Sequence, residues 1–357
     1  MTEANRVPED MMNTTSVHQN TTLAQATTSQ ADCVQIGLNP ISDFLMGVYI
    51  LAFVFGLTVN MLTLYPILHQ VKQQNILGIF LLSLSVSDLL FIFTMPLWIN
   101  YYNQDHKWNL GAMSCKVAGF FYYSNMYVSI YLLCCISVDR CLVVCYPLRF
   151  KSHRTHRYAW VLCAIVYVTV MVLHVIILSF GKSVDETSGR CYETYPMEKT
   201  VAIFNMVRVG LGFMLPLLVL AVSYWKVLAT VGRSPSLKTQ VKKKVRLLSF
   251  GVIGIFSICF APYHIILFIR SLVFFSNDNH SPEGPYCKFE QNIHFFFSVT
   301  LALSSLNSMV DPVLYVLVSN GVKDKMSKCW GRTKHTVSNE SSQGVFRRES
   351  PNDKGLI

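Results

Sequence analysis

Long apolar runs alternate with short polar segments along most of this 357-residue chain. Seven runs are long enough, at about 1.5 Å per residue in a helix, to cross a hydrocarbon layer roughly 30 Å thick. They cover residues 44–68, 76–99, 113–138, 159–180, 201–229, 247–275 and 293–318. The pattern predicts an all-α membrane protein, a bundle of seven transmembrane helices.

Composition favours lipid as the surroundings of these runs. The chain is 52% hydrophobic and 14% charged, whereas a soluble domain carries about 25% charged residues. The net charge of +10 is high, but the basic residues fall in short clusters between the apolar runs. A nucleic-acid partner, which would need a continuous basic surface, is therefore not expected.

The basic clusters also predict the orientation of the chain. Lys and Arg gather in alternate connecting segments, around residues 149–157, 238–246 and 323–328. Because such segments stay in the cytoplasm, we expect a multi-pass plasma-membrane protein with its N-terminus outside. We divide it into an extracellular tail (1–40), a seven-helix domain followed by a short amphipathic eighth helix (41–330) and a disordered cytoplasmic tail (331–357).

Several residues outside the apolar runs are candidates for modification. Asn13 and Asn20 begin glycosylation sequons in the extracellular tail. Cys329 follows the last span and is a candidate for palmitoylation, with a free cytosolic thiol as the alternative. Four cysteines fall on the outer side, where disulfides persist, and allow three pairings. We expect Cys115 with Cys191 and Cys33 with Cys287; the other cysteines have no metal-ligand spacing.

Ionisable residues inside spanning helices are costly, so each one is a candidate for function. Asp88 and Asp311 lie within two different spans. With nearby oxygen-bearing side chains they predict a pocket for a sodium ion or a shared proton. That pocket is expected to contain Asp88, Asn125, Ser129, Asn307, Ser308 and Asp311. The alternative is a water-bridged network without an ion, and no other cofactor is expected.

Proline interrupts four of the seven spans. Because proline lacks a backbone donor, Pro96, Pro216, Pro262 and Pro312 each predict a kink in a transmembrane helix. Kinked helices around a polar interior describe a bundle that can switch between two packings.

A set of motifs in order along the chain resembles the rhodopsin-like (class A) G-protein-coupled receptors over about residues 40–330. These motifs comprise Asn60, Leu84 with Asp88, Cys115, the Asp139-Arg140-Cys141 triplet, Pro216, Tyr224, Cys259 to Pro262, and Asn307 to Tyr315 in "NSMVDPVLY". Within the family the chain looks most like the proton-sensing and lysolipid-linked cluster, especially the branch associated with oxidised fatty acids. The stretches "MPLWINYY" and "CFAPYHIILFIRS" carry that resemblance.

The resemblance implies a receptor that passes an extracellular signal to heterotrimeric G proteins, with arrestin and receptor kinases as further partners. The implied activation and coupling residues are Asp139, Arg140, Tyr224, Phe260, Pro262, Asp311, Pro312 and Tyr315. Lys242 stands where many members have an acid that restrains the motif arginine, so we expect measurable basal signalling.

The outer half of the bundle is expected to hold the signal. The candidate ligand-binding residues are Tyr122, Tyr123, Met126, Tyr127, Arg208, His264, Arg270, Glu290 and His294. Aromatic walls with Arg208 suit an anionic lipid such as an oxidised fatty acid or a lysophospholipid. The alternative is that an internal acid or water neutralises Arg208. The outer histidines His106, His280 and His294 are candidates for a modest response to protons.

Other classes of membrane protein fit less well. The seventh span has no lysine for a retinal Schiff base, the chain shows no internal repeat of the transporter kind, and neither HExxH nor GxSxG occurs, so no enzyme is expected. The remaining alternative is a ligand-scavenging or arrestin-only receptor without G-protein turnover, which the Asp139-Arg140 pair argues against.

Overall fold

The computed structural model describes residues 39–147, 150, 154–180, 189–193, 197–233, 239–277 and 284–318. Seven of its helical segments are long and apolar enough to cross a membrane. Four spans are α2 (Asn39–Lys72), α3 (Ile76–Ile92) with α4 (Met95–Asn103), α5 (Ala112–Cys145) and α7 (His156–Phe180). The fifth span comprises α8 (Lys199–Val207), η2 (Arg208–Met214) and α9 (Leu215–Arg233). The sixth comprises α10 (Thr239–Ile255), η3 (Phe256–Phe260) and α11 (Ala261–Ser276). The seventh comprises α12 (Pro285–Ser305) and α13 (Asn307–Val318).

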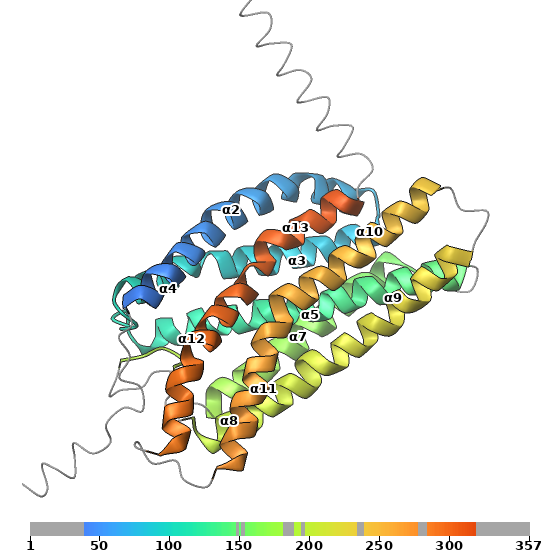
Figure 1. Ribbon diagram of the computed structural model, residues 1–357. Coiled ribbons are helices and arrows are strands. Elements are labelled where there is room, and N and C mark those ends of the chain that lie inside the picture. The colour runs from blue at the N-terminus through green and yellow to red at the C-terminus, as the bar shows by residue number, and fades with distance from the viewer. Residues whose placement is uncertain are drawn as a thin grey trace, which may run out of the picture.

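The spans lie side by side in one elongated bundle (Figure 1). Helix α5 packs against α3, α7 and α9, so the third span runs through the middle of the bundle. Helix α13 packs against α2, α3 and α10, which brings the last span back beside the first. The first and last spans of the seven-span domain are therefore adjacent.

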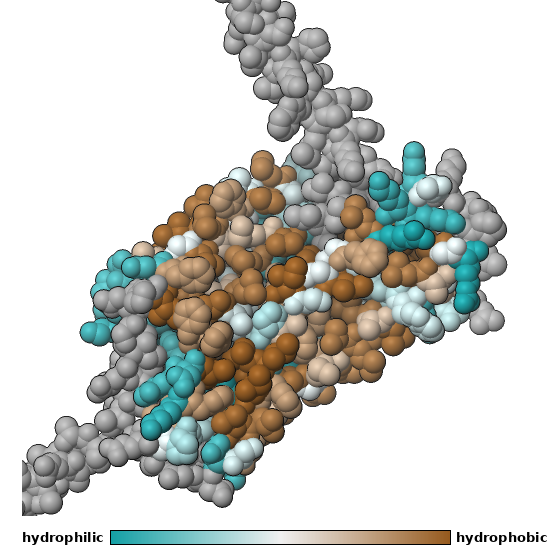
Figure 2. Space-filling model, viewed as in Figure 1, coloured by the Kyte–Doolittle hydropathy of each residue, from teal (hydrophilic) through white to brown (hydrophobic). Residues whose placement is uncertain are grey.

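The surface of the bundle has the composition expected for contact with lipid. Figure 2 shows a broad band of hydrophobic side chains between two hydrophilic ends. Large apolar side chains such as Leu62, Val168 and Phe250 are exposed, while polar ones such as Asn60 and Asp88 are buried inside the bundle. A bundle with apolar residues outside and polar residues inside is what a hydrocarbon solvent selects.

The helices extend beyond the apolar runs that predicted them. Helix α5 continues to Cys145, α10 begins at Thr239, and α12 begins at Pro285, so the predicted spans were too short at these ends. The backbone hydrogen bonds of a helix continue into the headgroup layer and the water beyond it, where polar side chains carry no cost. Hydropathy therefore locates the hydrocarbon layer and not the helix ends.

Each of the four predicted proline sites is preceded by an interruption of the α-helix. Because proline cannot donate to the carbonyl one turn before it, the preceding turn is free to widen or break. The interruptions are the α3–α4 break before Pro96, the π-helical η2 before Pro216, the π-helical η3 before Pro262, and the α12–α13 break before Pro312.

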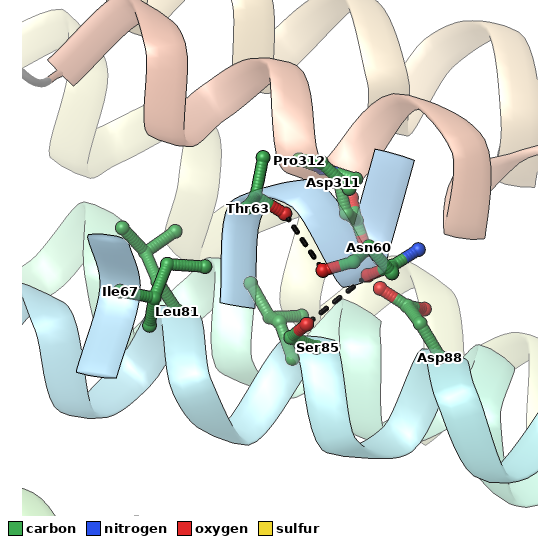
Figure 3. Close-up of a pocket in the computed structure, with 9 residues that line it drawn as sticks. Asn60, Thr63, Ile67, Leu81, Ser85, Asp88, Asp311 and Pro312 are labelled. Atoms are coloured by element: carbon green, nitrogen blue, oxygen red, sulfur yellow. Dashed lines mark hydrogen bonds between the residues drawn. The ribbon is translucent and has the colours of Figure 1, made fainter. Parts of the chain in front are cut away.

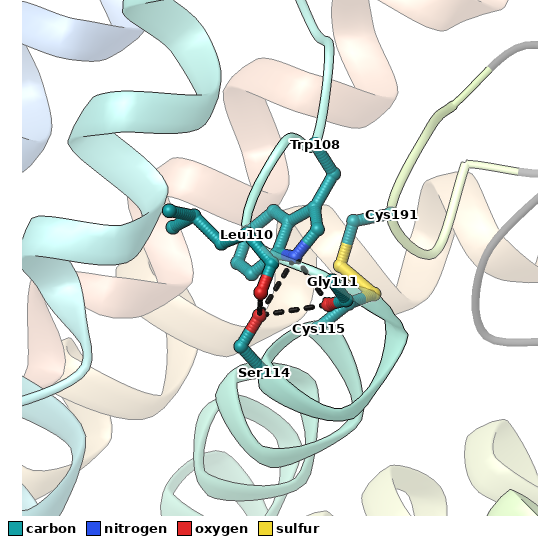
Figure 4. The surroundings of a disulfide bond; sticks show 6 residues. All are labelled: Trp108, Leu110, Gly111, Ser114, Cys115 and Cys191. Carbon is teal, nitrogen blue, oxygen red and sulfur yellow. Dashed lines mark hydrogen bonds between the residues drawn. A yellow bond between two sulfur atoms is a disulfide. The ribbon is translucent and has the colours of Figure 1, made fainter.

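The Cys115–Cys191 disulfide fastens the segment that follows α7 to the start of α5 (Figure 4), which confirms the first predicted pairing. Beside it, the Trp108 indole N–H donates to the Gly111 carbonyl and to the Ser114 hydroxyl, both at 3.0 Å. We call this the disulfide end of the bundle, and the opposite end, where α5 and α10 meet the Lys- and Arg-rich segments, the basic end.

Some predicted features lie outside the described residues. They are Asn13, Asn20, Cys33, His280, Cys329, the eighth helix, the tail 331–357 and the side chain of Tyr315. Cys287, the expected partner of Cys33, is buried in the first turn of α12, and that pairing stays a prediction.

Candidate functional site

Arg208 is the centre of a polar site inside the half of the bundle nearer the disulfide end. It is the first residue of η2, and its guanidinium carbon lies 4.9 Å from the centre of the Tyr123 ring. Its Nε is buried and makes no hydrogen bond, and within the described residues no carboxylate forms an ion pair with it. In the part of the chain that the structure describes, the cation is held by the face of an aromatic ring and not by a counter-ion.

Three more polar atoms around Arg208 are buried without hydrogen-bond partners in the described part of the chain: the Tyr127 hydroxyl, His174 Nε2 and His264 Nε2. Both histidines contact the Tyr127 ring: the ring centroid of His174 lies 5.5 Å from that of Tyr127, and the centroid of His264 lies 5.9 Å from it. Buried polar groups of native proteins are normally paired, so this concentration makes the place around Arg208 a candidate ligand-binding site.

The two histidines present a defined chemistry to that place. His174 Nδ1 contacts the Val170 carbonyl at 2.9 Å, and His264 Nδ1 contacts the Phe260 carbonyl at 2.8 Å. A carbonyl only accepts, so each Nδ1 carries the hydrogen, and in a neutral ring Nε2 is then an acceptor. The site thus combines donors, Arg208 and Tyr127, with two acceptor nitrogens.

Other residues predicted for ligand binding are engaged with their neighbours. The Tyr122 hydroxyl donates to the Leu301 carbonyl at 2.6 Å, and Met126 is buried. Arg270 pairs with Glu290 at 2.5 Å, and the Tyr286 hydroxyl donates to the same carboxylate at 3.1 Å. The structure therefore gathers Tyr123, Tyr127, Arg208 and His264 from the predicted set around one uncompensated charge.

His294 belongs to a separate cluster at the mouth of the disulfide end. Its Nε2 lies 3.7 Å from Oε2 of Glu193, whose other oxygen contacts His106 Nδ1 at 2.9 Å. Burial alone would raise the pKa of Glu193, but the charge and hydrogen bond of His106, and then those of His294, hold that pKa well below its usual range. His106 and His294 are buried, at 1% and 2% exposure.

A second polar site lies deeper, in a small cavity between α2, α3 and α13 (Figure 3). Asp88 and Asp311 both line it, and Asp88 Oδ2 and both oxygens of Asp311 have no hydrogen-bond partner among the described residues. Asn125 donates to Asp88 at 2.9 Å, and Asn307 donates to Ser129 at 3.1 Å. The predicted cluster is thus assembled around uncompensated carboxylate oxygens.

The third site is at the basic end, around Asp139. Arg154 binds both of its carboxylate oxygens, at 2.8 and 3.0 Å, while the neighbouring Arg140 approaches only to 3.8 Å. Arg140 Nε and the Tyr224 hydroxyl are buried without partners in the described part of the chain. Asp139 is therefore held mainly by Arg154, which leaves Arg140 loosely restrained. Phe260, at the end of η3, packs edge-on against Phe256.

Sequence reasoning missed Arg154, Tyr192 and Glu193. Arg154 lies 15 residues after Asp139 in a connecting segment, where no helical period relates the two. Tyr192 had a usable signal, because Gly119 comes one helical turn after Cys115 and Tyr192 directly follows Cys191. The disulfide places the Tyr192 ring where a Cβ at Gly119 would lie 2.0 Å away.

Comparisons with known proteins agree on one family. Residues 59–315 match the family described as 7 transmembrane receptor (rhodopsin family). The chain is 36% identical to probable G-protein coupled receptor 132 of Mus musculus, over 80% of this chain and 73% of that protein. It is 34% identical to G-protein coupled receptor 68 of Bos taurus, over 80% and 76%, and 28% identical to cysteinyl leukotriene receptor 2 of Homo sapiens, over 80% of each.

Gly212 offers a test of the Arg208 site that does not touch a polar group. A Cβ at Gly212 would lie 2.5 Å from Cε1 of Tyr127, so Gly212→Ala should displace that ring and destabilise the protein by about 1–3 kcal/mol, as overpacking does. Gly210 is also in η2 but has nothing within 4 Å of such a Cβ. Gly210→Ala should leave the thermal unfolding midpoint unchanged or slightly raised; equal midpoints for the two variants would contradict the packing described.

Proposed function

This chain belongs to the rhodopsin family of seven-transmembrane receptors, and from that premise we propose that it is a receptor for an anionic lipid. Its relatives are G-protein-coupled receptors and not enzymes, and the family places it as a multi-pass protein of the plasma membrane. Because disulfides persist outside the cytosol, we take the disulfide end as extracellular, with the N-terminus on the same side.

The single observation that carries the proposal is the uncompensated Arg208. A guanidinium buried among tyrosine and histidine rings keeps the cost of desolvation and gains no ion pair. A carboxylate or phosphate binds such a group through two parallel hydrogen bonds. The charge therefore selects an anion, while the aromatic walls select an apolar body.

The acceptor nitrogens narrow the ligand further. His174 Nε2 and His264 Nε2 need a donor, and an anionic headgroup supplies none. A hydroxyl on the same ligand supplies one, so an oxidised fatty acid that carries a hydroxyl fits better than a plain one. The relative named cysteinyl leukotriene receptor 2 carries the name of such a lipid-derived acid, which supports the proposal.

Replacing Arg208 tests the ligand class. Arg208→Ala removes a charged hydrogen-bond donor worth about 1.5–3 kcal/mol, so the potency of a hydroxylated fatty acid should fall roughly tenfold to a hundredfold. Arg208→Lys should keep part of that potency, since the lysine ammonium keeps the positive charge but cannot form the two parallel hydrogen bonds of the planar guanidinium. The measurement is nucleotide exchange on a heterotrimeric G protein, which also separates a signalling receptor from an arrestin-only one.

The methyl ester of the same fatty acid is the matched control, and it should be weak on the wild type and on Arg208→Ala alike. The titration is repeated from about pH 8 to pH 6, the histidine range. A lipid response that survives Arg208→Ala would contradict the proposal. A pH response without a lipid response would move the assignment to protons, the other expected signal.

We also propose that basal signalling arises from the loose restraint of Arg140. Arg154 occupies both oxygens of Asp139, so it competes with Arg140 for the same carboxylate. An arginine held weakly is available to a G protein without help from a ligand. Arrestin, receptor kinases, glycosylation at Asn13 and Asn20, and palmitoylation at Cys329 stay predictions.

Arg154→Ala should lower ligand-free signalling, because Asp139 is then left to Arg140 alone. An ion pair of this kind is worth about 0.5–1 kcal/mol, which corresponds to roughly a two- to fivefold change. Arg157 is exposed three residues later, in the first turn of α7, so Arg157→Ala is the control and should leave the signal unchanged. An increase of ligand-free signalling in Arg154→Ala would contradict this proposal, because it would show that the Asp139–Arg154 contact restrains the inactive receptor.

The Asp88 cavity is proposed to hold one sodium ion. Unpartnered carboxylate oxygens from α3 and α13 face it, and hard cations prefer oxygen ligands. An ion there would hold the two helices together, so replacing sodium by choline should raise ligand-free signalling about threefold in the wild type. Asp88→Asn should remove this response to sodium. Asp43→Asn, at an exposed carboxylate of α2, is the control and should keep the response. Equal responses in the two variants would refute the site.

A further inference from the structure

Three side chains from separate parts of the chain converge at the mouth of the disulfide end, apart from the Arg208 site. His106 follows α4, Glu193 follows the disulfide cysteine Cys191, and His294 lies in α12. One ligand atom from each lies within 4.8 Å of the others. The imidazole centroids of His106 and His294 are 5.9 Å apart, with Glu193 in contact with both rings.

Two histidines and one glutamate form a donor set with a known metal preference. Imidazole nitrogen with carboxylate oxygen suits Zn²⁺ among the common biological cations, and three protein ligands leave a fourth position for water. Bonds of about 2.0–2.1 Å to a tetrahedral ion place the ligand atoms about 3.3 Å apart. The contacts of 2.9 and 3.7 Å to Glu193 bracket that separation, so small side-chain movements complete the geometry.

The cluster is buried, which makes a proton on either ring costly. The His106 side chain is 0% exposed and the His294 side chain is 2% exposed, so charging either imidazole places the charge inside the protein. The neighbouring Glu193 carboxylate is 11% exposed, so an ion can reach it from the mouth of the bundle. An ion at the cluster supplies the positive charge that the two rings otherwise provide only when protonated.

We propose that His106, Glu193 and His294 bind a zinc ion, or a transition-metal ion of the same ligand preference, at the extracellular mouth of the bundle. The ion links the end of the second span, the segment that carries Cys191 and the start of the seventh span. Because one ion is bound by all three elements, binding stabilises one arrangement of the mouth. The site is independent of the proposed lipid pocket and of the sodium cavity.

The test uses the full-length receptor, purified in detergent and treated with a chelator. Zn²⁺ added in large excess over its dissociation constant should raise the thermal unfolding midpoint of the wild type by about 5 °C. Mg²⁺, which prefers six oxygen ligands, should not raise it. No shift with Zn²⁺, or equal shifts with both ions, would overturn the proposal without recourse to any variant.

Variants then locate the ion. His106→Gln and His294→Gln should each lose most of the zinc-induced shift, whereas His69→Gln, at an exposed histidine of α2, should retain it. A variant is compared only if its midpoint in chelator shows a cooperative transition, and Glu193→Gln is the third member of the set. A full zinc shift in any of the three cluster variants would place the ion elsewhere and overturn the assignment.

Discussion

The hydrocarbon core of a membrane offers no hydrogen bonds, so polar groups of this chain must be paired inside the bundle. Asn60 shows how one side chain meets this requirement. Its amide donates to the Gly56 carbonyl of its own helix and to the Ser308 carbonyl of α13, at 2.9 and 2.8 Å, and its oxygen accepts from Ser85 of α3 at 3.1 Å. Three spans are joined by one amide. Where several polar groups in one place lack such partners among the described residues, as around Arg208, the place is a candidate binding site.

The interrupted helices determine where those places are. Proline releases a carbonyl in spans five and six, and the chain widens into η2 and η3. Arg208 is the first residue of η2 and Phe260 the last of η3. One π-helical segment therefore begins at a residue predicted to bind the ligand, and the other ends at a residue predicted to act in activation. Return of such a segment to regular α-helix would rotate every residue on one side of it. The prolines thus place both the binding residue and the activation residue at points that can shift register.

The sequence predicted what hydropathy and helical period report directly. It predicted the seven spans, the buried acids Asp88 and Asp311 and the interior side of α5, because lipid excludes charge and a helix repeats every 3.6 residues. It could not distinguish Tyr122 from Tyr127. The Tyr122 hydroxyl donates to a carbonyl of another span, whereas the Tyr127 hydroxyl has no hydrogen-bond partner among the described residues. Arg154 and Glu193 were missed because connecting segments have no period. Their roles depend on contacts across the fold, which only the assembled bundle defines.

The arginines of the bundle differ in how well their charge is compensated, and that difference relates binding to signalling. Arg270 has Glu290 at 2.5 Å, and Arg154 has both oxygens of Asp139. Arg140 reaches that carboxylate only at 3.8 Å, and Arg208 has an aromatic ring in place of an acid. The two poorly compensated cations lie towards opposite ends of one bundle, and each is partly buried, which carries a cost that an ion pair does not offset. Under the proposed function, an anion at Arg208 and a G protein at Arg140 would each favour the same change of packing, and that shared preference would be the coupling free energy between the two ends.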